Sequence, residues 1–72
     1  MENQNQNKNG KWEVLSNYIT GVGERYIVAR LINVDEPMHS GNLEHYGEYT
    51  SDKASAERIA NALNEMEGRE NG

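Results

Sequence analysis

"KWEVLSNYITGVGERYIVARLINV", residues 11–34, consists of two apolar runs separated by a glycine-rich break. In residues 11–19 apolar and polar side chains alternate, which is typical of a β-strand. Residues 25–34 are rich in β-branched and aromatic types, which also favour a strand. Between the two runs, Gly21 and Gly23 can adopt the positive φ angles of a tight turn. The stretch therefore predicts an antiparallel β-hairpin.

After the hairpin, the pattern predicts a third strand and a helix. "HYGEYT", residues 45–50, contains aromatic and β-branched residues, and Gly47 is a candidate for a bulge or for a close approach of the backbone. Ser51 and Asp52 supply capping side chains for a helix over residues 53–67. The apolar residues of that helix recur at helical spacing and form one stripe: Ala56, Ile59, Ala60, Leu63 and Met66. We predict an α+β fold in which a three-stranded antiparallel sheet is followed by one C-terminal amphipathic helix packed on one face (β-β-β-α).

The domain boundaries follow from composition. Residues 1–10 are rich in Asn and Gln and have no apolar side chain after Met1, so we expect a disordered tail. Residues 11–67 form the single β-β-β-α domain, and residues 68–72 are expected to be a disordered C-terminus.

One helix cannot cover both faces of a sheet, yet both faces of the first two strands carry apolar residues. We expect Trp12, Val14 and the tyrosines to lie beneath the helix. The other register then supplies a candidate interaction face, through which the chain could form a homodimer, and its residues are Leu15, Ile19, Ile27 and Leu31.

Composition excludes several kinds of chemistry. The chain has no cysteine, which removes disulfides, thiolate metal sites and thiol nucleophiles. Its formal net charge of −5 repels phosphate and disfavours nucleic-acid binding. No apolar run has the length of a signal peptide or a membrane span, so we expect a cytoplasmic protein without membrane contact.

Histidine and carboxylate side chains are concentrated in one segment, "DEPMHSGNLEH", residues 35–45. The spacing of its two histidines matches no standard metal site, and Pro37 and Gly41 indicate turns, so we predict no metal. A small sheet with one helix encloses little pocket volume, so we predict no enzyme, no catalytic residue and no cofactor. Because binding residues concentrate on loops, the segment is a candidate contact loop with the residues His39, Ser40, Asn42 and His45.

The chain also resembles a protein family. The resemblance to small uncharacterised proteins of Gram-positive bacteria and their mobile elements is carried by Trp12-x-Val14, Ser16-Asn17-Tyr18, Tyr26-x-Val28-x-Arg30-Leu31, His39-Ser40-Gly41-Asn42, Tyr46-Gly47-x-Tyr49, Ala56-Glu57 and Leu63-Asn64. It implies the fold but no activity. A more distant likeness, in architecture alone, is to the arm-type DNA-binding domains of integrases, which bind DNA through the sheet. This chain departs from that pattern at Glu13, Glu24 and Glu48.

These observations lead to two functional hypotheses. The first is a non-enzymatic protein–protein interaction module that is homodimeric through the open face of the sheet. The alternative is a nucleic-acid-binding module that resembles an integrase arm and depends on Arg30.

Overall fold

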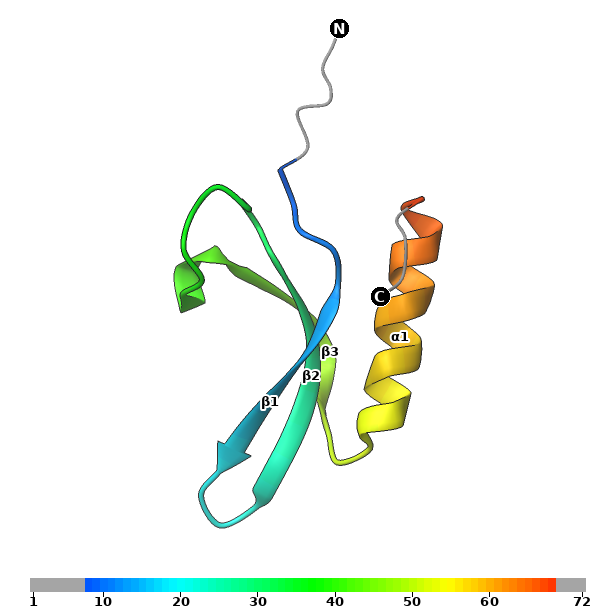
Figure 1. Ribbon diagram of the computed structural model, residues 1–72. Helices are drawn as coiled ribbons and strands as arrows, with labels where there is room; N and C mark the ends of the chain where they lie inside the picture. The colour runs from blue at the N-terminus through cyan, green and yellow to red at the C-terminus, as the bar shows by residue number, and fades with distance from the viewer. Residues whose placement is uncertain (1–7, 69–72) are drawn as a thin grey trace, which may run out of the picture.

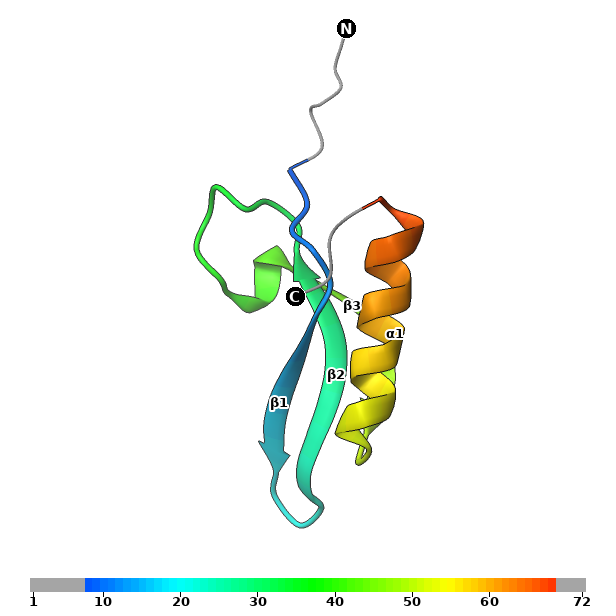
Figure 2. The same cartoon turned by 45° about the vertical axis from the view of Figure 1, so that its right-hand side comes forward.

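The computed structural model describes residues 8–68, which form one sheet and one long helix. The three strands form an antiparallel sheet in the order β1-β2-β3, and α1 lies across one of its faces (Figures 1 and 2). A short 3₁₀ turn, η1, precedes β3. The elements are β1 (Glu13–Ile19), β2 (Gly23–Leu31), η1 (Ser40–Asn42), β3 (Leu43–Thr50) and α1 (Lys53–Met66). The predicted β-β-β-α fold is confirmed.

The termini of the chain differ partly from the prediction. Residues 1–7 and 69–72, most of the predicted tail and C-terminus, lie outside the described residues. Residues 8–10, which their composition assigns to the tail, bond to the domain instead: Gly10 N–H donates to Leu31 O at 2.8 Å, and Val34 N–H donates to Lys8 O at 2.9 Å. Backbone pairing needs no apolar side chain, so composition did not indicate it.

The core lies between α1 and the sheet. Trp12 and Val28 are 6% and 2% exposed and pack against Ala56 and Ala60, whose small side chains let the helix lie close to the strands. Val14, Tyr26 and Leu63 complete this cluster. Trp12 and Val14 therefore lie beneath the helix, as expected, whereas Tyr18 is 74% exposed and Met66, in the last turn of α1, is 81% exposed.

The helix begins where the sequence places it. Asp52 caps α1 by accepting hydrogen bonds from the N–H groups of Ala54 and Ser55. The hydroxyl of Ser55 also donates to Asp52 at 2.7 Å. This hydroxyl bond, followed by the backbone bond from Ser55, lowers the pKa of the Asp52 carboxyl.

β3 contains an irregularity. Tyr26 of β2 pairs with Thr50, but Val28 pairs with Tyr46, so β3 carries extra residues between these two pairs. Gly47 has a φ of +76°, which only glycine adopts without strain. This is the predicted bulge, and it sets the direction of the residues that follow it.

Candidate interaction surfaces

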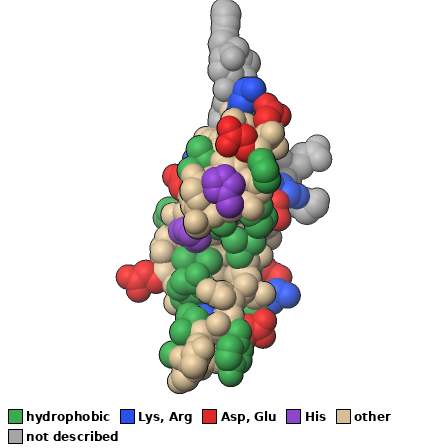
Figure 3. Space-filling view, turned by 90° about the vertical axis from the view of Figure 1, so that its left-hand side faces the viewer, with side chains coloured by type: hydrophobic (Ala, Val, Ile, Leu, Met, Phe, Trp, Pro, Cys, Tyr) green, Lys and Arg blue, Asp and Glu red, His purple; other side chains and the backbone are tan. Residues whose placement is uncertain are grey.

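The sheet face opposite α1 is named here the open face (Figure 3). Successive side chains of a strand point to opposite faces, and Val14, Tyr26 and Val28 lie under the helix. The alternate residues therefore form the open face: Glu13, Leu15, Asn17, Ile19, Arg25, Ile27, Ala29, Leu31, Leu43 and His45. Figure 3 shows hydrophobic side chains extending along this face from the hairpin end to the loop end.

Part of the open face is covered by the chain itself. Asn17 of β1 donates a hydrogen bond to the Tyr49 hydroxyl of β3 at 3.4 Å. Because β2 lies between these strands, the Tyr49 side chain must reach across β2. Ile27 of β2 is 6% exposed although it lies on the face opposite α1, whereas Tyr49 is 44% exposed. Ile27 is therefore buried, and its predicted place in an exposed interaction face is corrected.

The other predicted members of this face remain partly accessible. Leu15, Ile19 and Leu31 are each half-buried on the open face. Beyond the end of β2, Ile32 and Met38 in the following loop are exposed, at 45% and 61%. Apolar surface therefore continues from the sheet into the loop.

Asn42 organises that loop and is itself buried, at 4% exposure. Its Oδ1 accepts from Asn33 N–H at 2.9 Å. Its Nδ2 donates to the carbonyls of Asn33, Glu36 and Pro37 at 3.0, 3.4 and 3.1 Å. A side chain with these partners cannot meet another molecule, so the prediction of Asn42 as a contact residue is wrong, and it instead holds the loop in shape.

The two histidines lie in different elements, His39 in the loop before η1 and His45 in β3. His39 is exposed, and its Nδ1 accepts from Gly41 N–H at 3.1 Å, which stabilises the turn at Ser40. His45 lies in β3 opposite Ala29, on the open face, whereas its neighbour Glu44 points to the helix side. Among residues 8–68, no group of three or more histidine or carboxylate side chains could hold a metal ion.

Arg30 belongs to a cluster on the helix side of the sheet. Its guanidinium carbon lies 4.4 Å from the centre of the Trp12 ring. It forms ion pairs with Glu44 at 2.9 Å and Glu67 at 3.0 Å, and Glu67 also accepts from the Trp12 indole at 3.2 Å. Arg30, on which the nucleic-acid hypothesis depends, is thus already engaged by two carboxylates.

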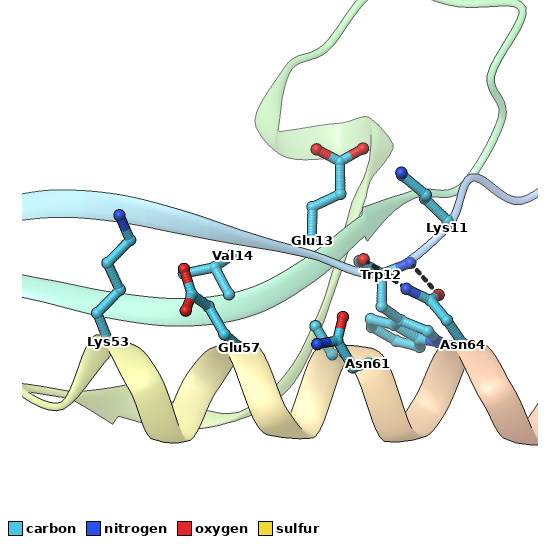
Figure 4. Close-up of a pocket in the computed structure, with 9 residues that line it drawn as sticks. Lys11, Trp12, Glu13, Val14, Lys53, Glu57, Asn61 and Asn64 are labelled. Carbon is cyan, nitrogen blue, oxygen red and sulfur yellow. Dashed lines mark hydrogen bonds between the residues drawn. The ribbon is translucent and has the colours of Figure 1, made fainter. Parts of the chain in front are cut away.

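A groove of about 480 Å³ runs between β1 and α1 (Figure 4). Val14 and Ala60 are among its apolar lining residues, and the helix contributes Lys53 and Glu57. At one end is Asn64, which is 2% exposed.

The Asn64 side chain bonds the backbone of the segment that leads into β1. Its Oδ1 accepts from Trp12 N–H at 2.7 Å, and its Nδ2 donates to Trp12 O at 3.0 Å. The amide thus pairs with Trp12 as a peptide group of a neighbouring strand would (Figure 4). In the sequence, Asn64 contributes to the family resemblance but has no predicted role, although it follows Ala56 and Ala60 at intervals of four residues and so lies on the apolar stripe.

No helix in the described part of the chain is long and apolar enough to cross a membrane. Comparison of the chain with protein-family models, curated proteins and solved structures gives no match.

Proposed function

We propose that the protein is a non-enzymatic protein–protein interaction module that binds an apolar surface of another protein through its open face. One observation carries this proposal: no helix within residues 8–68 covers that face, and Leu15, Ile19 and Leu31 remain partly accessible on it. Fully burying an aliphatic side chain contributes about 1.5–3 kcal/mol, so a partner that covers these residues gains binding energy.

The charge distribution defines the chemistry of the partner. The chain carries a net charge of −5, yet among the paired residues of the open face Glu13 is the sole carboxylate. Asp35 and Glu36 lie exposed in the loop at the end of the face, and Asp35 already pairs with Lys8 at 2.7 Å. We therefore expect a partner surface that is apolar at its centre and has a basic group near Glu36.

Leu31→Asp tests the proposal because it places a charge within the apolar surface of the open face, at the loop end of β2. Met66→Asp is the matched control, since Met66 is 81% exposed and lies on the helix. Both variants are first shown by circular dichroism to be folded. Tagged wild type and variants then capture partners from the native cytoplasm, and each captured protein is purified and its affinity measured directly by calorimetry.

We expect the purified partner to bind wild type and Met66→Asp equally and Leu31→Asp at least about tenfold more weakly, which corresponds to about 1.4 kcal/mol. Equal binding to all three proteins refutes the open face as the binding surface. Light scattering after size exclusion identifies the homodimeric case, in which wild type is dimeric and Leu31→Asp is monomeric. Salt-dependent binding of duplex DNA that is lost in Arg30→Ala would instead support the nucleic-acid alternative.

A further inference from the structure

We propose that β1 pairs antiparallel with β1 of a second copy of the chain, about a two-fold axis at Leu15, so that the two sheets join edge to edge. This inference goes beyond the proposed function and does not depend on it. The open face of each copy stays uncovered in such a dimer.

The first argument is the unpaired outer edge of β1. Trp12, just before β1, directs both its backbone N–H and its C=O to Asn64 and not to β2. Backbone groups along an antiparallel strand alternate in direction, so those of Val14 and Ser16 also point away from β2. Within residues 8–68, no strand lies beyond β1. The backbone groups of Val14 and Ser16 are therefore available to another strand, whereas those of Trp12 are already bonded to Asn64.

The second argument is the contrast between the two sheet edges. Proteins protect edge strands with bulges and with charged side chains. β3 has both, because the Gly47 bulge interrupts its pairing and Glu44 and Glu48 lie along it. β1 has a regular register over its whole length, and Glu13, its first residue, is its one charged residue. β1 is therefore the edge that can accept a further strand.

The third argument restricts the register, and within that restriction the side chains favour Leu15. A residue whose backbone N–H and C=O point away from β2 can pair only with a residue of the second copy whose backbone groups also point outward. A two-fold axis at Leu15 meets this condition because it places Val14 opposite Ser16 of the second copy. The two Leu15 side chains then form a close cross-strand pair on the open face. Glu13 comes opposite Asn17, so no like charges meet along the strands.

The fourth argument is the order in which the charged side chains of α1 lie along the groove between β1 and α1. Figure 4 shows Glu57 next to Val14 and Lys53 farther toward the hairpin. Neither side chain forms an ion pair within the described part of the chain. The axis at Leu15 reverses this order in the second copy, so that each Lys53 faces the other copy's Glu57.

A crosslinking experiment tests the register, because the chain has no cysteine of its own. With the axis at Leu15, the Cβ atoms of two cysteines at position 15 lie about 5 Å apart, close to disulfide distance. Two cysteines at position 17 are about 13 Å apart along the strands. Under mild oxidation we expect a disulfide dimer of Leu15→Cys on a non-reducing gel, and none of Asn17→Cys. Equal yields from the two variants, or no dimer from Leu15→Cys, overturn this register.

Reversing the charges at positions 53 and 57 tests the interface in the cysteine-free protein. Lys53→Glu places carboxylates face to face, and glutamate in the first turn of a helix is compatible with folding. Sedimentation equilibrium at low salt should show a dissociation constant about tenfold higher than that of wild type. Adding Glu57→Lys should restore the wild-type value.

Three results overturn the proposal. They are a strict monomer at millimolar concentration, a Lys53→Glu variant that dimerises like wild type, and a double variant that is not restored. Leu31→Asp separates this interface from association through the open face, since it should leave the β1 dimer intact.

Discussion

Replacing Asn64 by alanine removes the amide that joins the start of the sheet to the last turns of α1. Asn64 is 2% exposed and bonds both backbone groups of Trp12, at 2.7 and 3.0 Å. Alanine at this position leaves the Trp12 N–H and C=O without their partner in a place where the helix hinders water. An unsatisfied buried polar group costs about 1–3 kcal/mol.

Two such groups give an expected loss of about 2–6 kcal/mol in the free energy of unfolding. A domain of 72 residues has a total stability of about 4–11 kcal/mol, so the variant loses a large part of it. A loss of this size lowers the melting temperature by about 10–50 °C.

Urea unfolding measures the effect, with the fluorescence of Trp12, the chain's one tryptophan, as the signal. Asn61→Ala is the matched control, because Asn61 is exposed on the same helix and also lines the groove. We expect the control to change stability by less than about 0.5 kcal/mol. If Asn64→Ala is as stable as the control, the two hydrogen bonds to Trp12 do not hold the helix to the sheet.

Three further changes test other parts of the structure. Asn42→Ala should destabilise the domain by about 2–4 kcal/mol and raise amide hydrogen exchange throughout the loop, whereas unchanged exchange would contradict the role of Asn42 as the loop's anchor. Tyr49→Ala should uncover Ile27 and cost about 1–2 kcal/mol in urea unfolding, while Tyr49→Phe, which keeps the ring, should cost less than half as much. Because its pKa is lowered in the folded state, ionised Asp52 stabilises the helix above the unfolded pKa, at about pH 4, and this contribution is lost as the pH falls through the folded pKa. The difference in melting temperature between wild type and Asp52→Ala should therefore shrink from pH 7 to pH 3, and a constant difference would show that the charge of Asp52 has no part in capping.

The elements of the fold could be predicted because their signals are local. Alternation along residues 11–19 indicates a strand, and Asp52 followed by alanines at intervals of four residues indicates a capped helix. The turn glycines and the Gly47 bulge were also predicted, since positive φ angles favour one residue type. Each of these signals lies within a few residues of the feature that it predicts.

The candidate surfaces were predicted less well because they depend on distant contacts. The pattern places Ile27 on the open face correctly, but its burial depends on Tyr49, 22 positions later and beyond a bulge. Asn42 was chosen as a contact residue because polar loop residues often bind, yet the carbonyls of its own loop enclose it. Asn64 was missed because its partner is Trp12, 52 residues away.

The bonds between Trp12 and Asn64 also constrain the order of folding. Their partners are separated by 52 residues, and the core that they border combines Trp12 and Val28 with Ala56 and Ala60. An isolated two-stranded hairpin is at best marginally stable in water, and contacts between distant residues form slowly. On the ribosome, β1 and β2 therefore emerge long before the helix that stabilises them, with the edge of β1 exposed. The domain becomes stable only once residue 64 has left the exit tunnel, because until then Trp12 lacks its partner on the helix.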